Sequence, residues 1–413
     1  MNSRQPVRRI EAYRQIQLER CGSWDESVHV FDEDSALAVE MALATGRPLL
    51  VRGEPGSGKS QLARAAAQVL NRAFIAEIIT GAQDGQDLLW HYDPVARLYD
   101  AQTLAAEAAA RAYQQEPEED EAGEERAPAA AAQPEPASQQ KKLARFRKKK
   151  TLQQKRQNLF KAIGLAAARS DFPGRTGDEL HPASWISPGP LWWALDWASA
   201  LRQHERCRCP FYQPPVCSSL PPEEAAQRGT VLLLDEIDKA EPSLPNTLLE
   251  VLGNGSFSVP LLGQTISAPP GCPQPLLIIT TNEERELPPA FVRRCLVFQL
   301  RLDDEQRLRR WWSRQPFQAE PFHAERALVK WLAERGELHF AQQFAAKVRE
   351  RAAELLLRDR REARQAGLIK PGQAEYLDLL LALRNMTQPG ASDEQLALLE
   401  RISPFAFSKD RQE

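Results

Sequence analysis

The stretch that decides the fold is Gly53-Glu54-Pro55-Gly56-Ser57-Gly58-Lys59-Ser60, with Gln61 directly after it. A glycine, four further residues, and then glycine, lysine and a hydroxyl residue form the Walker A pattern, which binds nucleotide phosphates. The glycines let the backbone wrap closely around a phosphate, so that the amide groups of the loop point at its oxygens. We expect Lys59 to bind the β- and γ-phosphates and Ser60 to ligate Mg²⁺.

The residues on either side of this loop have the pattern that the motif requires. Residues 47–52 (RPLLVR) are typical of a short buried strand, and residues 61–70 are rich in alanine and leucine, as helices are. Four more apolar segments of strand length lie at 74–79, 230–234, 275–281 and 295–300. Helical segments alternate with these strands, so the sequence predicts an α/β fold with a five-stranded parallel sheet between helices.

Two carboxylates, Asp235 and Glu236, follow the apolar run at 230–234 and fit the Walker B pattern. Acidic side chains at the carboxyl end of a buried strand lie at the mouth of such a site. We expect Asp235 to hold Mg²⁺ and Glu236 to orient and polarise the attacking water. Asn282 follows the strand at 275–281, where it can reach the γ-phosphate and the water, although turn and helix N-cap asparagines are common.

Arg293 and Arg294 end a short predicted helix before the last strand. A guanidinium suits the charge that spreads over the phosphoryl group in phosphoryl transfer. The simpler explanation of two adjacent arginines is a solvated surface pair.

Composition limits the class of protein. The chain has 413 residues, a net charge of −3 and 42% hydrophobic residues, which fits a protein of two or three domains without a general basic field for nucleic acid. The N-terminus lacks the apolar region of a secretion signal, and the longest apolar runs are too short to span a bilayer. Six cysteines do not make a disulfide framework in a chain of this length, so we expect a cytoplasmic protein with reduced thiols.

The segments divide as follows: residues 1–30 form an N-terminal segment, 31–301 an α/β core, and 302–413 a smaller helical domain. A charged, low-complexity insertion interrupts the core at about 101–180, with acidic residues at 116–126 and a basic run at 141–150. Such a segment cannot bury a core. We interpret it as a solvated insertion, with a docking arm for a partner or nucleic acid as the alternative.

The order of these motifs resembles the AAA+ ATPases, and most of all their MoxR branch. The fragments that carry this resemblance are DLLWHYDPVARL (87–98), GPLWWALD (189–196), LLLDEIDKAEPSLPNTLLEVL (232–252) and TTNEERELPPAFVRRC (280–295). The resemblance covers roughly residues 34–301 well and the C-terminal helices more loosely.

The resemblance implies an ATP-hydrolysing core with a helical lid and a ring of subunits, usually a hexamer. It implies that Asn282 is sensor 1 and that Arg294, or failing that Arg293, is a finger reaching the ATP of the next subunit. Residues 80–92 and the hairpin at 255–270 would engage a substrate or partner. The family's lid often carries a sensor 2 arginine where this chain has Lys370-Pro371-Gly372-Gln373, so either Lys370 replaces it or sensor 2 is missing.

Two weaker clusters leave alternatives open. His204, Cys207, Cys209 and Cys217 are close enough in sequence to bind Zn²⁺, but their spacing is unusual for a zinc finger and a loop with free thiols is the simpler interpretation. Four tryptophans at 185–197 are either buried or part of a partner-facing surface.

Three hypotheses for function follow. The leading one is an ATP-driven, chaperone-like machine that remodels a protein client. The second is a scaffold whose nucleotide state controls docking of a partner such as a von Willebrand factor A domain protein. The third is a nucleic-acid-linked NTPase motor, for which the basic run at 141–150 is the clearest support. No membrane association is expected from the sequence.

Overall fold

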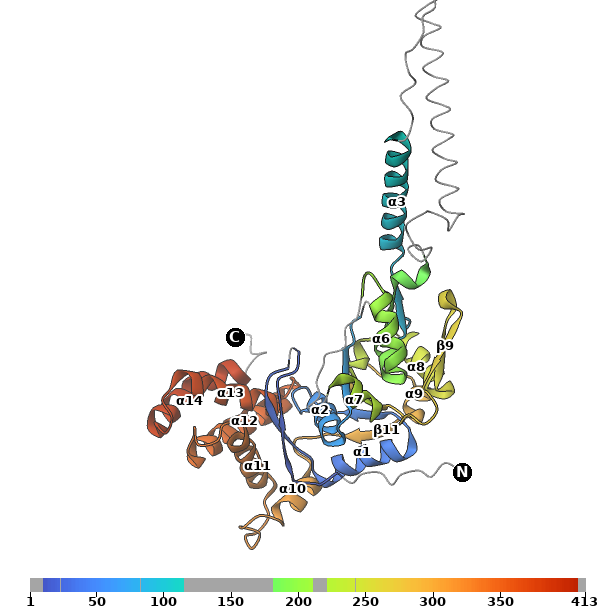
Figure 1. Ribbon diagram of the computed structural model, residues 1–413. Coiled ribbons are helices and arrows are strands. Elements are labelled where there is room, and N and C mark those ends of the chain that lie inside the picture. The colour runs from blue at the N-terminus through green and yellow to red at the C-terminus, as the bar shows by residue number, and fades with distance from the viewer. Residues whose placement is uncertain are drawn as a thin grey trace, which may run out of the picture. The chain divides into compact units, whose positions relative to one another are not determined.

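The computed structural model describes residues 10–22, 24–81, 83–114, 181–210, 221–241 and 243–407. Its centre is a five-stranded parallel sheet with the strand order β11-β3-β10-β7-β4 (Figure 1). The strands are β3 (Leu49–Arg52), β4 (Ala73–Ile78), β7 (Thr230–Asp235), β10 (Leu276–Thr281) and β11 (Leu296–Gln299). The predicted α/β fold and its five strands are therefore confirmed, each to within two residues at either end.

The central strands are apolar because both faces of the sheet are covered. All six residues of β10 are buried, as are the first five of β7. Parallel strands end at the same edge of a sheet. The residues that follow β3, β7 and β10 are therefore brought together, and these are the Walker A loop, Glu236 and Asn282.

Helices with well-formed ends flank the sheet. Helix α1 (Glu33–Thr45) begins at a capping box in which Asp32 and Ser35 bond each other's backbone, and it ends at Gly46 in the left-handed region. Helix α2 (Lys59–Leu70) starts inside the Walker A loop. The other helices of this part are α5 (Pro190–Leu195), α6 (Trp197–Arg206), α7 (Pro222–Gln227), α8 (Ser243–Asn254), α9 (Pro289–Arg294) and the 3-10 turns η2 (Ile237–Lys239) and η3 (Pro260–Leu262).

The C-terminal part contains five helices, coloured orange to red in Figure 1. They are α10 (Glu305–Trp312), α11 (Ala324–His339), α12 (Ala346–Ala366), α13 (Gln373–Met386) and α14 (Ser392–Phe407). They enclose a separate apolar cluster that includes Trp311, Trp331, Leu356, Tyr376 and Leu380. The helical periodicity after residue 302 is thus confirmed.

Two hairpins lie outside the main sheet. Strands β8 (Ser256–Val259) and β9 (Gln264–Ser267) form the antiparallel hairpin expected within 255–270. Strands β1 (Gln15–Leu18) and β2 (Ser27–Val30) form a second antiparallel pair within residues 1–30, for which the sequence predicted only an N-terminal segment. The short strands escaped notice because they are partly exposed, and only alternate residues such as Ile16 and Leu18 are buried.

The chain divides into two compact units. The first combines residues 1–91, 188–203 and 211–413, and so holds the sheet and the C-terminal helices. The second combines 92–187 and 204–210, with helix α3 (Pro94–Gln114) and the 3-10 turn η1 (Pro182–Trp185). Strands β5 (Trp90–Tyr92) and β6 (Ile186–Pro188) lie at the points where the chain passes from one unit to the other.

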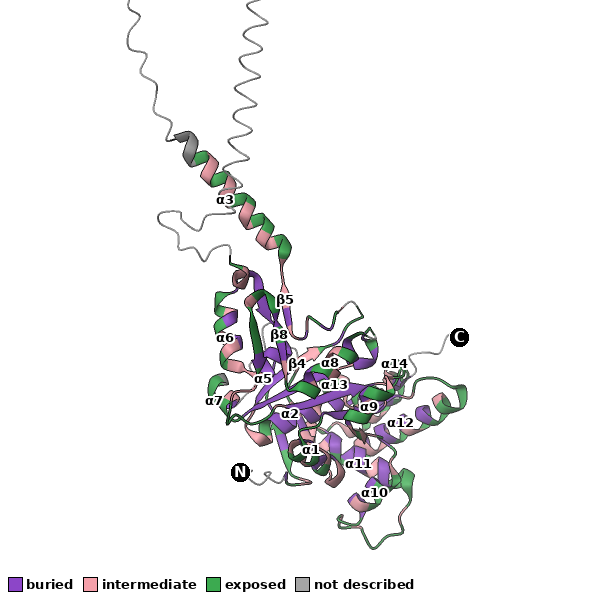
Figure 2. Cartoon of the chain, turned by 90° about the vertical axis from the view of Figure 1, so that its right-hand side faces the viewer, coloured by how far each residue is buried: buried purple, intermediate pink, exposed green. Residues whose placement is uncertain are grey.

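The second unit contains the described part of the predicted insertion. Helix α3 extends through residues 101–114, and it is drawn in pink and green in Figure 2 because its described residues are exposed or half-buried. Its start is capped by Asp93, which accepts from the backbone of Ala96 at 2.8 Å. The acidic and basic segments of the insertion lie outside the described residues.

Burial answers the question for three of the four tryptophans, while Trp197 is half-buried. Trp185, Trp192 and Trp193 are at most 2% exposed, so these three do not form a partner-facing surface. Cys21 is disulfide-bonded, which contradicts the expectation of reduced thiols at that position, whereas Cys207, Cys209, Cys272 and Cys295 are free. Within the described ranges, no helix has the length and apolar character needed to cross a membrane.

Candidate nucleotide-binding site

The Walker A loop has the backbone shape that its glycines permit. Gly56 and Gly58 have φ angles of +70° and +90°, in the left-handed region where side chains cause strain. A Cβ atom at Gly53 would lie 2.3 Å from the carbonyl oxygen of Leu300, so only glycine fits there. The Ser57 hydroxyl is buried and has no hydrogen-bond partner within the described chain. The loop therefore offers an unsatisfied polar group where phosphate binding is expected.

Lys59 lies at the centre of the site and is only 7% exposed. Its ammonium donates to the carbonyls of Gly53 and Glu54, both at 2.9 Å, and to Asn282 Oδ1 at 2.7 Å. Burial lowers the pKa of Lys59 from its ordinary value, and the nearby carboxylate of Asp235 acts in the opposite direction. This partly desolvated cation is suited to an anionic ligand.

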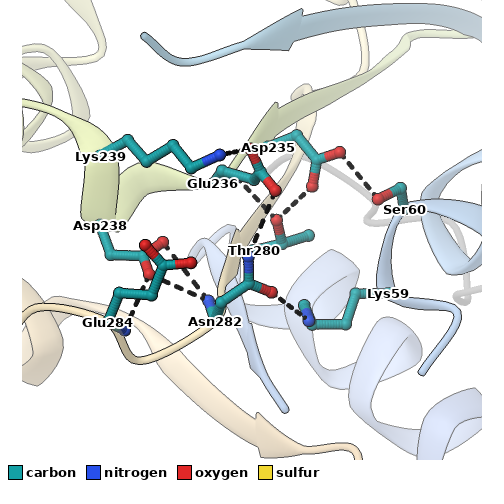
Figure 3. A network of polar contacts seen from close by, with 9 residues as sticks. All are labelled: Lys59, Ser60, Asp235, Glu236, Asp238, Lys239, Thr280, Asn282 and Glu284. Atoms are coloured by element: carbon teal, nitrogen blue, oxygen red, sulfur yellow. Dashed lines mark hydrogen bonds and ion pairs between the residues drawn. The ribbon is translucent and has the colours of Figure 1, made fainter. Parts of the chain in front are cut away.

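The two expected Mg²⁺ ligands are adjacent. Ser60 Oγ donates to Asp235 Oδ2 at 2.8 Å (Figure 3). Asp235 Oδ1 accepts from the hydroxyl of Thr280, which is fully buried. Thr280 was not among the predicted site residues, but the pairing of β7 with β10 places it beside Asp235, one step beyond the Leu234–Ile279 pair.

Glu236 is held in an unusual backbone conformation. Its φ of +61° is in the left-handed region, which non-glycine residues rarely adopt outside constrained sites. Its amide donates to Thr280 Oγ1 at 3.0 Å, and its carboxylate accepts from Asn282 Nδ2 at 3.2 Å and from Lys239 Nζ at 2.6 Å. The expected base and the expected sensor 1 thus share a hydrogen bond.

Asp238, which was not among the predicted site residues, fixes the segment that carries Asn282. Asp238 is 3% exposed, and its carboxylate accepts from the amides of Asn282, at 3.2 Å to Oδ2, and of Glu284, at 3.0 Å. Figure 3 shows both contacts. A buried carboxylate just after Walker B, in DEID, is the signal that could have revealed it.

Arg293 and Arg294 are at the exposed end of α9. Arg294 donates to the carbonyl of Leu249 at 2.7 Å. The contacts found among the described residues do not join either guanidinium to Lys59 or Glu236. Arg47 donates to the carbonyls of Arg293, Arg294 and Cys295 at 2.6, 3.1 and 2.9 Å, which ties the end of α9 to the residues before β3.

Lys370 lies against the Walker A loop, but it contacts a side chain of that loop. Its ammonium donates to Glu54 Oε1 at 2.5 Å, and Arg360 donates to Glu54 Oε2 at 2.8 Å. Burial raises the pKa of Glu54, but the hydrogen bonds from Lys370 and Arg360 outweigh it, so the pKa lies below its ordinary value.

The proposed zinc cluster receives no support from the part of the chain that is described. There, no group of three or more histidine, cysteine or acidic side chains is arranged to hold a metal ion. Cys207 is buried and Cys209 exposed, while Cys217, the fourth candidate, lies outside the described residues.

The residues fit a magnesium–nucleotide ligand. Mg²⁺ prefers oxygen ligands, and the paired Ser60 hydroxyl and Asp235 carboxylate supply two. The buried ammonium of Lys59 and the unpartnered Ser57 hydroxyl provide donors for phosphate oxygens. A bound Mg²⁺ would neutralise phosphate charge, and these four residues would hold the ion and the phosphates.

Comparison with known protein families gives one match, which covers part of the sheet. Residues 219–295 match the model of the AAA domain of the dynein-related subfamily. Among solved structures, a candidate ATPase from Cytophaga hutchinsonii ATCC 33406 is similar over 90% of this chain and 78% of its own, with 13% identity and a TM-score of 0.29. Curated proteins gave no match. The sheet order, together with the match at residues 219–295, gives the chain the α/β fold of the AAA+ ATPases.

Proposed function

We propose that this protein hydrolyses ATP with Mg²⁺ and belongs to the MoxR-like branch of the AAA+ ATPases. The observation that carries the proposal is the convergence of Lys59, Ser60, Asp235, Glu236 and Asn282 at one edge of the sheet. Gly53–Gln61 would enclose the phosphates, and Ser60 and Asp235 would hold Mg²⁺. Glu236 would accept a proton from the attacking water, and Asn282 would orient that water and the γ-phosphate.

The second part of the proposal is a ring, with a hexamer as the expected size, in which Arg294 or Arg293 reaches the ATP of the neighbouring subunit. Both arginines are exposed and belong to a helix that Arg47 holds in place. A guanidinium supplied by a neighbour stabilises charge that develops only in the transition state. The ring would convert hydrolysis into remodelling of a protein client, with a von Willebrand factor A domain protein as the expected companion.

ATP hydrolysis by the purified chain tests the first part. We expect Mg²⁺-dependent release of phosphate, its loss in Lys59→Met, and in Glu236→Gln a fall of about 100-fold or more with ATP binding retained. Glu286→Gln, an exposed acid four residues after Asn282, is the matched control. Equal activity in Glu236→Gln and the control would reject the assigned base.

The dependence of activity on protein concentration tests the second part. Activity per subunit should rise through the range in which the oligomer assembles, as measured by light scattering in the same samples. The rise should be lost in Arg294→Ala, or in Arg293→Ala if that residue is the finger. A constant activity per subunit across assembly would contradict a site shared between subunits.

A further inference from the structure

One side chain of the Walker A loop is bound by two cations of the C-terminal helices. Glu54 accepts from Arg360 of α12 and from Lys370, which lies between α12 and α13. The Arg360 side chain is 5% exposed, and its other terminal nitrogen donates to the carbonyl of Pro371 at 2.6 Å. A buried guanidinium with both ends occupied fixes the position of its partners.

The backbone of the loop is also in contact with the start of α13. The amide of Ala374 donates to the carbonyl of Gly56 at 3.0 Å. A Cβ atom at Gly372 would lie 2.8 Å from the carbonyl oxygen of Pro55, so the two segments approach as closely as glycine permits. Glu375 caps the start of α13 by accepting from the amide of Gly372 at 2.9 Å. The loop and the helix start therefore form one packed, hydrogen-bonded contact.

Glu54 joins this contact to the phosphate-binding lysine. Its carboxylate binds Arg360 and Lys370, and its own carbonyl accepts from Lys59 Nζ at 2.9 Å. A shift of the C-terminal helices would pull on Glu54 and displace one of the three oxygens that hold the Lys59 ammonium. Displacements of this kind are costly because catalytic groups work only near one geometry.

We propose that Glu54 is a positioning residue through which Arg360 and Lys370 set the place of Lys59. This inference rests on the proposed nucleotide site, and it gives Lys370 a role different from that of a sensor 2 arginine. Lys370 acts on the loop, and the loop acts on the phosphates. For Lys370 it adds an indirect function to the two alternatives that the sequence left open, a replacement for sensor 2 or no sensor 2 at all.

A double-mutant cycle separates the two roles of Lys370. Glu54→Gln and Lys370→Gln are each expected to lower kcat/KM for ATP by about fivefold or more, and the double variant should lose no more than the stronger single one. Non-additivity is expected because both changes break the same contact. If the two losses multiply, Lys370 acts on the nucleotide independently of Glu54 and the inference is wrong. Unchanged kinetics in Glu54→Gln would overturn it equally.

The matched control is the ion pair between Lys330 and Glu350, which joins α11 to α12. Its side chains are 33% and 31% exposed, against 31% and 28% for Lys370 and Glu54. Breaking either ion pair should therefore cost a similar amount of folding stability. Lys330→Gln and Glu350→Gln should leave kcat/KM near the wild-type value. Losses equal to those in the Glu54 cycle would assign the effect to general destabilisation and overturn the inference.

Hydrogen exchange tests the contact without any nucleotide. In Glu54→Gln and in Arg360→Gln, peptides covering 53–60 and 370–376 should exchange faster together, because the Ala374 amide loses its support. Arg358→Gln, a half-exposed cation on the same helix, should leave both peptides unchanged. If the wild type hydrolyses no ATP, the proposed function fails while this measurement still decides the contact. Unaltered exchange in both peptides would contradict the inference.

Discussion

Ser60 Oγ donates to Asp235 Oδ2 at 2.8 Å, which joins two residues that are 175 positions apart in the chain. The contact exists because β3 and β7 both flank β10 and end at the same edge of the sheet. Thr280 of β10 donates to the other oxygen of Asp235. The carboxylate is therefore oriented from two sides before any ion is bound, which favours tight binding of a metal.

Removing the charge of this carboxylate should weaken metal binding. In Asp235→Asn we expect the Mg²⁺ concentration for half-maximal ATP binding to rise by about tenfold to 100-fold, because one anionic oxygen is replaced by an amide. This Mg²⁺ concentration is measured by titrating Mg²⁺ while the binding of a fluorescent ATP analogue is followed. Asp393→Asn, at a side chain that is 97% exposed, is the control. A Mg²⁺ dependence identical to that of the wild type would rule out Asp235 as a metal ligand.

Asp238 provides a second prediction, because it holds the backbone of Asn282. In Asp238→Leu, which has a similar size but no acceptor, the amides of Asn282 and Glu284, which both donate to Asp238 Oδ2, would lose that acceptor. An unsatisfied buried donor costs about 1–3 kcal/mol of unfolding free energy. We expect that loss in urea unfolding, together with a lower kcat and a nearly unchanged Kd for ATP.

The contrasting variant is Asn282→Ala, which removes the amide side chain but leaves both backbone bonds to Asp238. It should lower kcat, but its free energy of unfolding should change no more than that of a typical surface variant. If Asp238→Leu kept the wild-type kcat, the position of Asn282 would not depend on this carboxylate.

Several parts of the site could be predicted because each is a local pattern. Walker A, Asp235 and Asn282 each follow a short apolar run, and a parallel sheet brings the ends of such runs together. Thr280 and Asp238 could not be recognised in the same way. Their roles depend on the register of β7 against β10 and on the fold of the segment after Asn282, which only the three-dimensional arrangement provides.

The interpretation of Lys370 shows a different limit. Its position in the chain indicated a place near the nucleotide, and it does lie against the Walker A loop. Its partner, Glu54, occupies one of the positions that the Walker A pattern leaves open. A motif cannot reveal a contact made by its variable residues, so the link from Arg360 and Lys370 to Lys59 had no signal in the sequence.

His29 gives a prediction of pH dependence. Burial, with Arg335 as the next cause, lowers the pKa of His29 from 6.5 to about 3, while Asp32 opposes the shift and Arg307 and His339 add to it. The unfolded chain therefore binds a proton below pH 6.5 that the folded chain rejects. The contribution of neutral His29 to the free energy of unfolding should be complete above pH 6.5. It should decrease as the pH drops toward 3, by up to about 1.4 kcal/mol per pH unit.

His29→Phe should reduce this slope between pH 6.5 and 5, above the range in which most carboxylates titrate. The slope that remains is expected from His339, whose pKa burial also lowers. Phenylalanine preserves the edge-on ring contact with Phe31, at 4.8 Å between centroids, and removes the buried Nε2 that lacks a partner within the described chain. Urea unfolding at a series of pH values measures the slope. His323→Gln, at an exposed histidine, should keep the wild-type slope. A slope in His29→Phe equal to that of the wild type would exclude His29 as its source.

Arg47 leads to the final prediction, since it binds the carbonyls of Arg293, Arg294 and Cys295. In Arg47→Gln the end of α9 loses those bonds, and a finger placed there should no longer reach the neighbouring subunit. We expect ATP binding to persist while the activity of the assembled protein falls. Direct binding and phosphate release, measured on the same sample, separate the two effects.

Rings of mixed subunits test whether Arg47 acts on the nucleotide site of its own subunit or on that of the neighbour. Glu236→Gln lacks the base but keeps α9, whereas Arg47→Gln keeps the base but has a displaced α9. In rings mixed one to one, about a quarter of the interfaces would pair an intact base with an intact finger, so activity should return although each variant alone is nearly inactive. Arg294→Ala mixed with Glu236→Gln is the reference. If that reference recovers and Arg47→Gln does not, Arg47 supports its own site or the fold instead of the finger. If neither mixture recovers, the finger does not act between subunits.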